Sequence, residues 1–107
     1  MIEVHKENFE AEVLQAKGIV FVDFWSPKCV PCMALFPEVE AFVERNADKA
    51  KFCKLDTSTN ARLALSQKVM ALPTFVFYKD GEKVFTFDKD SIEMGAVEAK
   101  LHELLDA

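Results

Sequence analysis

Residues 19–32 read IVFVDFWSPKCVPC, and this stretch carries most of the information about the architecture. Its first half, residues 19–25, consists of β-branched and aromatic residues with one exception, Asp23. A run that is apolar on both faces is typical of a strand buried on both sides of a sheet. Its second half holds Cys29 and Cys32, followed by a segment with helical periodicity. The stretch therefore predicts a buried strand that leads two cysteines to the start of a helix.

The rest of the chain alternates between strand and helix patterns. These patterns predict strands at residues 2–5, 51–56, 74–79 and 82–87, and helices at residues 9–16, 32–46, 61–65 and 91–104. Asn8 and Ser91 are the expected caps of the first and last helices, and Asp80-Gly81 is a strong hairpin turn. A strand–helix–strand unit needs a parallel crossover, whereas a hairpin is antiparallel. The predicted class is α/β, a mixed central sheet with helices on both faces in the order β-α-β-α-β-α-β-β-α.

Length and composition restrict the kinds of protein this chain can be. The 107 residues suit one domain spanning residues 1–107, and the 50% hydrophobic content excludes a disordered chain. No apolar run approaches the ~20 residues of a membrane span. A net charge of −5 without a Lys/Arg cluster disfavours nucleic acid. Residues 1–9 lack the pattern of a secretory signal. We therefore expect a cytoplasmic monomer that contacts neither membrane nor nucleic acid.

The spacing of the cysteine pair favours redox chemistry. A sulfur at a helix start meets unpaired backbone N–H groups that stabilise a thiolate, and Lys28 adds a positive charge beside Cys29. Pro31 suits the first helical turn, where its missing N–H costs nothing. Cys32 is close enough to resolve a mixed disulfide. Cys29 is therefore the expected attacking cysteine and Cys32 the resolving one.

A metal site is the main alternative for this pair. A structural zinc site needs four ligands, and the remaining candidates Cys53, His5 and His102 are scattered along the chain. We therefore expect neither a metal nor a cofactor. Cys53 is interpreted as a small buried hydrophobe, with a regulatory thiol as the alternative.

Four segments together resemble the thioredoxin family over nearly the whole chain. They are FVDFW at 21–25, CVPC at 29–32, LPT at 72–74 and KDGE at 79–82. The resemblance implies a thioredoxin fold, with a mixed central β-sheet flanked by four α-helices. It also implies a dithiol–disulfide oxidoreductase, an electron carrier that reduces disulfides in target proteins. A flavoprotein thioredoxin reductase would regenerate the dithiol.

The resemblance also implies roles for residues on the two inner strands. Asp23 matches the buried carboxylate that exchanges a proton with the resolving cysteine. Its apolar neighbours Val22 and Phe24 should raise its pKa by desolvation, as a proton carrier near pH 7 requires. Lys54 matches the lysine that partners this carboxylate, and Trp25 matches the tryptophan beside the dithiol. An Asp and a Lys that both face solvent are the alternatives.

Pro73 matches the family's cis-proline, which faces the dithiol. Leu72 would then offer its N–H and C=O to an extended target segment, as in strand addition. A trans proline at a strand start is the alternative. The expected substrate-binding residues are Trp25, Lys28, Val30, Pro31, Leu72 and Pro73.

The chain departs from the usual family motif next to the cysteines. Lys28 and Val30 stand where the family usually has Trp and Gly, and Met33 stands where it usually has Lys. Residues between the cysteines tune the potential, so a disulfide oxidant or isomerase and a non-catalytic scaffold subunit stay open as alternatives. Residues 87–90 predict a charged partner surface. These departures resemble thioredoxins of amino-acid-fermenting anaerobic bacteria, which implies delivery of electrons to glycine-type selenoenzyme reductases and peroxidases.

Overall fold

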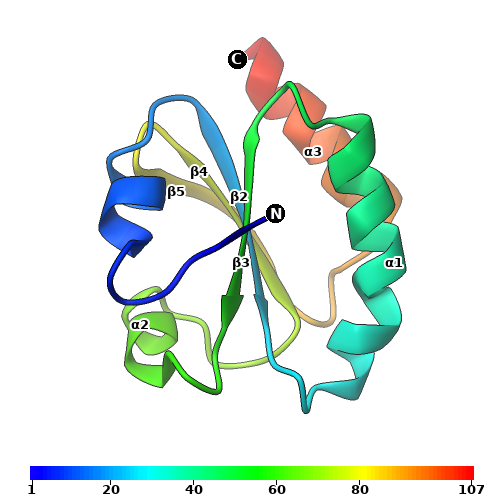
Figure 1. Ribbon diagram of the computed structural model, residues 1–107. Coiled ribbons are helices and arrows are strands. Elements are labelled where there is room, and N and C mark those ends of the chain that lie inside the picture. Colours follow the sequence, from blue (N-terminus) through cyan, green and yellow to red (C-terminus); the bar gives the residue numbers. More distant parts are fainter.

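All five strands of the computed structural model, which describes residues 1–107, belong to one mixed sheet (Figure 1). The strands lie in the order β1-β3-β2-β4-β5. Their bounds are Ile2–Glu3 for β1, Ile19–Trp25 for β2, Lys51–Asp56 for β3, Thr74–Lys79 for β4 and Glu82–Phe87 for β5. Strand β3 pairs in parallel with β1 and β2, whereas β4 pairs antiparallel with β2 and β5. Strand β2 is therefore central and hydrogen-bonded on both sides.

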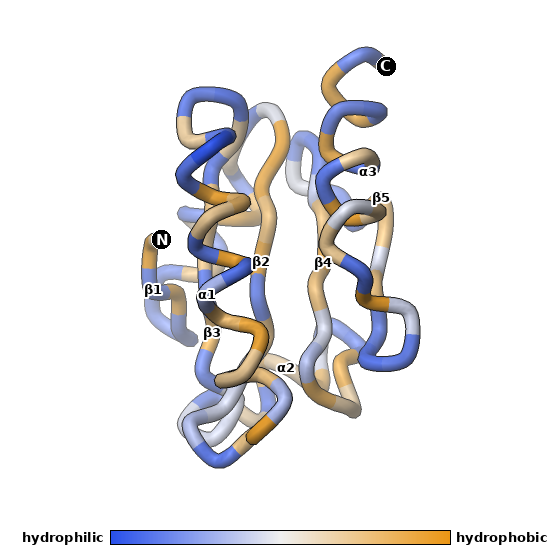
Figure 2. The backbone as a smooth tube through the Cα atoms, turned by 90° about the vertical axis from the view of Figure 1, so that its right-hand side faces the viewer, coloured by the Kyte–Doolittle hydropathy of each residue, from blue (hydrophilic) through white to orange (hydrophobic).

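Helices cover both faces of this sheet. Figure 1 shows α1 (Val30–Arg45) and α3 (Met94–Asp106) on one face, and η1 (Glu10–Leu14) and α2 (Ala61–Ser66) on the other. The predicted α/β class and the predicted element order are both confirmed. In Figure 2, β2 and β4 carry mostly hydrophobic colours, whereas α1 and α3 alternate between the two extremes. That alternation is expected of helices that bury one side against a sheet.

The predicted burial of β2 on both faces is confirmed. Residues 19–24 are all buried, and successive side chains enter two separate cores because a strand alternates its faces. Val20, Val22 and Phe24 pack in the core beneath η1 and α2. Phe21 packs in the core beneath α1 and α3, where four further rings surround it with centroids 5.2–5.9 Å away: Phe42, Phe52, Phe75 and Phe77.

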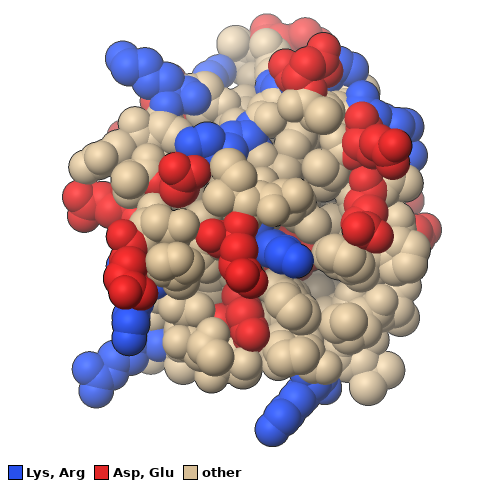
Figure 3. All heavy atoms as spheres, viewed as in Figure 1, with Lys and Arg blue, Asp and Glu red and all other residues tan.

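Acidic side chains are spread over the surface of the molecule, and several of them come from α1. Figure 3 shows red side chains on the right of the view, where α1 lies, and also at its centre and left, with no extended basic patch on this face. The exposed acidic residues of α1 are Glu38, Glu40 and Glu44. No helix combines the length and the apolar character needed to cross a membrane.

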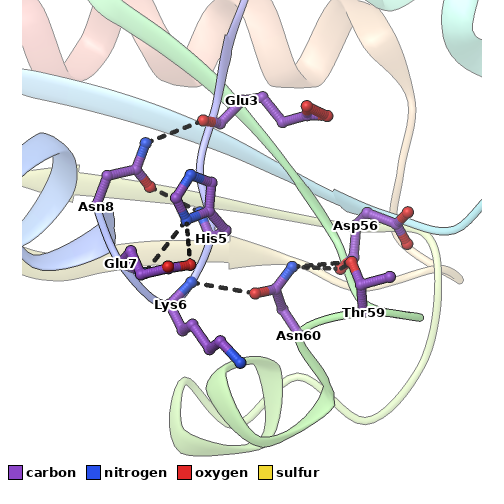
Figure 4. A network of polar contacts seen from close by, with 8 residues as sticks. All are labelled: Glu3, His5, Lys6, Glu7, Asn8, Asp56, Thr59 and Asn60. Atoms are coloured by element: carbon purple, nitrogen blue, oxygen red, sulfur yellow. Dashed lines mark hydrogen bonds and ion pairs between the residues drawn. The ribbon is translucent and has the colours of Figure 1, made fainter.

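The N-terminal segment differs from its prediction. Strand β1 ends at Glu3, and η1 is one π-helical turn closed by the Gln15 N–H donating to the Glu10 carbonyl at 2.8 Å. Asn8 does not cap this helix. Its Oδ1 accepts from the His5 N–H at 2.7 Å, and its Nδ2 donates to the Glu3 carbonyl at 3.1 Å (Figure 4). The Asn8 side chain therefore closes the preceding turn, and none of its hydrogen bonds goes to an N–H group of the helix.

A second polar link holds the N-terminal segment to the loop after β3. The Lys6 N–H donates to the Asn60 Oδ1 at 3.1 Å, and the Asn60 Nδ2 donates to the Asp56 carbonyl at 3.0 Å (Figure 4). Asp56 is the last residue of β3 and pairs with Trp25, the last residue of β2. These bonds therefore attach the N-terminal segment to the end of the two strands that is nearest the cysteine pair.

The predicted cap of the last helix is also wrong. Glu93, and not Ser91, is the N-cap of α3. The Glu93 carboxylate accepts from the N–H groups of Gly95 at 2.7 Å and Ala96 at 3.1 Å. The Ser91 hydroxyl instead donates to the Asp88 carbonyl at 3.0 Å. Ser and Glu side chains can both accept hydrogen bonds from backbone N–H groups. The path of the loop before α3 therefore decides which of the two residues caps the helix.

The C-terminal end of α1 is tied to α3 by a side-chain network. Glu98 Oε1 accepts from Arg45 Nη2 at 2.7 Å, and Glu98 Oε2 accepts from Asn46 Nδ2 at 2.8 Å. The buried Asn46 Nδ2 also donates to the Phe42 carbonyl at 2.8 Å, and Asn46 Oδ1 lies 3.2 Å from His102 Nε2. The hydrogen bond from Arg45, then that from Asn46, lowers the pKa of Glu98 to about 2. This network fixes the far end of the helix that begins at the cysteines.

Candidate active site

The cysteine pair lies where β2 leads into α1. Cys29 is the N-cap residue of α1 and Cys32 is in its first turn, and the two form a disulfide with 5.2 Å between their Cα atoms. The Cys29 sulfur accepts from the Cys32 N–H at 3.3 Å. Pro31 occupies the first helical turn, as the sequence predicts. One sulfur therefore sits at the positive end of a helix, where a thiolate is stabilised.

The two cysteines differ in their access to solvent. Cys32 is buried with 7% of its surface exposed, whereas Cys29 is half-buried. Lys28 is exposed, and Val30 leaves 77% of its surface open to solvent. Cys29 is therefore the more accessible sulfur of the pair, and a positive charge and an apolar side chain flank it in the sequence.

Asp23 is buried behind the pair. Only 4% of its surface is exposed, and burial raises its pKa from 3.8 to about 7, with the charge of Lys54 opposing the rise. Asp23 lies on the same face of β2 as Phe21, toward α1, because side chains alternate along a strand. The raised pKa expected from its apolar neighbours is present, and the solvent-facing alternative is wrong.

Lys54 lies directly opposite Asp23 in the parallel pairing of β3 with β2. The two side chains do not form an ion pair within 4.0 Å, although the Lys54 charge lowers the pKa of Asp23. The Lys54 Nζ instead lies 5.6 Å from the ring centroid of Trp25 and 5.6 Å from that of Phe36. Lys54 therefore acts on the carboxylate from a distance.

One small pocket connects the carboxylate with the buried cysteine. It has a volume of about 210 Å³ and is lined by Asp23, Trp25, Cys32, Met33, Phe36 and Lys54. The indole N–H of Trp25 is buried without a hydrogen-bond partner, while its carbonyl accepts from the Thr57 N–H at 2.8 Å. The Asp23 carboxyl and the Cys32 sulfur therefore share one cavity.

A groove runs from the first turn of α1 to the loop before β4. The Leu72–Pro73 peptide bond in this loop is cis, as the resemblance implies. The groove has a volume of about 490 Å³ and is lined by Pro31, Ala34, Leu35, Glu38, Leu72, Pro73, Lys89, Asp90 and Ile92. Lys89 and Asp90 give this groove a charged rim, whereas Phe87, at the start of the segment expected to be charged surface, is buried.

Cys53 takes no part in this site. It lies within β3 with no exposed surface, and burial raises the pKa of its thiol to about 11. The expectation that Cys53 is a small buried hydrophobe is confirmed. Neither Cys53 nor the two histidines join the cysteine pair, and no three His, Cys, Asp or Glu side chains gather to hold a metal ion.

Sequence reasoning did not identify Phe36 as a residue of the site. The structure leaves Phe36 half-buried, lining the pocket beside Lys54. Phe36 stands four residues after Cys32, and residues at this spacing share a helix face. That spacing is the signal that could have linked Phe36 to the site.

Comparison with known proteins identifies the same family that the sequence motifs resemble. The family model for thioredoxin matches residues 1–104. A thioredoxin of Acetoanaerobium sticklandii is 42% identical over 105 residues, covering 98% of this chain and all of the relative. A thioredoxin of Peptoclostridium acidaminophilum is 44% identical over 101 residues, covering 94% and 92%. One of Bacillus subtilis is 36% identical over 86 residues, covering 80% and 81%.

A mixed sheet flanked by helices, with a Cys-x-x-Cys disulfide at a helix start and a cis-proline in the adjoining loop, defines the class of thiol–disulfide oxidoreductases. This chain belongs to the thioredoxin family, with relatives among anaerobic bacteria as the sequence predicts. It is a thiol–disulfide oxidoreductase that reduces disulfides in other proteins. Members of the family are themselves reduced by thioredoxin reductase.

Proposed function

We propose that Cys29 begins the reaction as a thiolate. Its sulfur attacks one sulfur of the target disulfide, forms a mixed disulfide and displaces the other target sulfur as a thiolate. The Cys32 thiolate then attacks the Cys29 sulfur. This closes the Cys29–Cys32 disulfide, releases the second target thiolate and transfers two electrons to the target. The half-buried position of Cys29 and the burial of Cys32 support this order of attack.

Asp23 accepts the proton that Cys32 must lose before it attacks. The observation that carries this proposal is that Asp23 and Cys32 line the same pocket of about 210 Å³. A carboxyl whose pKa is raised to about 7 is matched to proton transfer at neutral pH. Lys54 opposes this rise with its charge and so sets where in the neutral range Asp23 titrates.

The target lies along the groove beside the disulfide. Leu72, which lines the groove together with Pro73, offers its backbone N–H and C=O to an extended target segment. The remaining contact surface consists of Trp25, Lys28, Val30 and Pro31. The ammonium of Lys28 adds a charge where the family usually presents an indole.

The cellular setting is also part of the proposal. The chain works as a single domain and a monomer in the cytoplasm, binds no nucleic acid, and is recycled by a flavoprotein thioredoxin reductase. The net charge of −5 and the family membership support this setting. The family's chemistry needs no metal and no bound cofactor in this chain.

Cysteine variants test the order of attack. Cys29→Ser should abolish reduction of insulin by dithiothreitol, whereas Cys32→Ser should retain the attacking sulfur and accumulate covalent complexes with disulfide-containing proteins. Cys53→Ala is the matched control, and it should turn over like the unsubstituted protein. Trapping by Cys29→Ser instead of Cys32→Ser would reverse the assignment, and trapping by neither would refute it.

A redox titration followed by Trp25 fluorescence distinguishes a reductase from an oxidant. Lys28 is the observation that favours the second function, because a positive charge beside Cys29 stabilises the reduced form. A transition near about −270 mV supports a reductase, whereas one at about −120 to −180 mV supports an oxidant or isomerase. Absence of any transition would indicate a scaffold.

A further inference from the structure

Lys54 has no polar partner that holds its ammonium group in place. None of the ion pairs of the molecule includes it, although Asp23 lies directly opposite in the sheet. Two rings take the place of such a partner. The Nζ lies 5.6 Å from the ring centroids of both Trp25 and Phe36, a distance at which a ring attracts a cation.

The Lys54 side chain lies between two hollows that both contain acidic residues. One is the pocket that holds Asp23 and Cys32. The other has a volume of about 320 Å³ and is lined by Glu40 and Glu44 of α1, with Met1, Val43, Phe36 and Lys54. Phe36 and Lys54 line both hollows. An ammonium released from the rings would be drawn toward the two glutamates that line this second hollow.

We propose that Phe36 is a positioning residue of the reaction: with Trp25, its ring holds the Lys54 ammonium beside the pocket shared by Asp23 and Cys32. The ring thereby keeps this cation from moving to the glutamates of α1. The inference rests on the proposed role of Asp23 in proton transfer, and it assigns to Phe36 the task of fixing the charge that acts on Asp23.

The charged groups around the pocket make the direction of the effect clear. Lys54 is the only cation among the residues lining it, and its charge lowers the pKa of Asp23 against the effect of burial. The other charges nearby are Glu40 and Glu44 from α1 and the amino terminus at Met1, which lines the second hollow. Loss of the ring moves the cation away from Asp23 and toward the glutamates, so the pKa of Asp23 rises.

The test is a titration of the Asp23 carboxyl carbon by NMR in Phe36→Leu and in the matched control Phe36→Tyr. The oxidised protein is used, so that no Cys32 thiol titrates nearby. Phe36→Leu should raise the pKa of Asp23 by about half a pH unit, whereas Phe36→Tyr keeps the ring and should leave it unchanged. Phe36→Met, which also lacks a ring, serves as a second variant should the leucine protein not fold.

Three outcomes would overturn the proposal. A lowered pKa would mean that the ring acts by excluding water, an unchanged pKa with reduced stability would mean a packing role only, and an equal rise in Phe36→Tyr would exclude the ring as the cause. In a Lys54→Met background, Phe36→Leu should cause no further change. The titration needs no turnover, so its failure is distinct from a failure of Asp23→Asn to slow the reaction.

Discussion

Asp23 and Glu98 lie near opposite ends of α1, and their pKa values move in opposite directions. Asp23 faces the first turn of the helix without a cation within 4.0 Å, and burial raises its pKa to about 7. Glu98 accepts hydrogen bonds from Arg45 and Asn46 at the last turn, and these lower its pKa to about 2. Burial without a close donor therefore moves the pKa of one carboxylate up to near neutral pH, and hydrogen-bond donors move that of the other down.

The largest expected effect is on stability at the Asp23 end. Ionising this carboxylate in the folded protein is unfavourable, so wild-type stability should fall as pH rises from about 3.8 to about 7. Asp23→Asn should be more stable by up to about 4 kcal/mol above pH 7, and equally stable below pH 4. Urea unfolding of the oxidised proteins at pH 4 and pH 8, followed by Trp25 fluorescence, measures this. A difference independent of pH would contradict the raised pKa.

The second effect concerns the reaction rate and is again expected for the substitution of Asp23, at the N-terminal end of α1. Asp23→Asn removes the proposed proton acceptor of Cys32 and should slow resolution of the mixed disulfide at pH 7 about 100-fold. The defect should shrink at higher pH, where solvent deprotonates the thiol. Single-turnover reduction of a disulfide peptide between pH 6 and pH 9 provides the measurement. Equal slowing at every pH would show that the carboxylate only maintains the structure.

The third prediction concerns Asn46, the central residue of the hydrogen-bond network at the C-terminal end of α1. Asn46 is buried and bonds Phe42, Glu98 and His102, so Asn46→Ala should cost about 2 kcal/mol of unfolding free energy. The rate of disulfide reduction should stay at the wild-type value. Urea unfolding and an insulin reduction assay on the same sample measure the two effects. A rate that falls with stability would mean that the two ends are coupled through α1.

The smallest effect is expected for Glu98→Gln. The Glu98 side chain is 23% exposed and its partner Arg45 is 55% exposed, so solvent screens the pair and the loss at pH 7 should be about 1 kcal/mol. Because the folded pKa is lowered, this contribution is present above about pH 4.5 and is lost as pH falls toward 2. Unfolding of the variant and the wild type across this range tests the sign, which is opposite to that for Asp23.

The sequence was most informative where one strand and one motif define the structure. The burial of β2, the hairpin at Asp80-Gly81 and the position of the cysteine pair followed from periodicity and residue type. The raised pKa of Asp23 was predictable as well, because a carboxyl group on an apolar strand that is buried on both faces loses contact with water.

Features that depend on distant side chains were not predictable. Asn8 and Ser91 have the right chemistry for caps, but Asn8 bonds His5 and Glu3, and Glu93 caps α3. The network around Glu98 joins residues more than 50 positions apart, so no local sequence pattern predicts it. The contact of Lys54 with its two rings likewise joins residues of two strands and a helix, which no local pattern predicts.

The central position of β2 has a consequence for amide hydrogen exchange. Its N–H groups bond to β3 and β4, and packed cores cover both its faces, so its amides should exchange only when the whole sheet opens. Strand β1, held through two residues, and β5, paired on one side only, should exchange much sooner. Asp23 lies on this slowest-opening strand and the cysteine pair follows it directly, so local opening of β1 or β5 should leave their geometry intact.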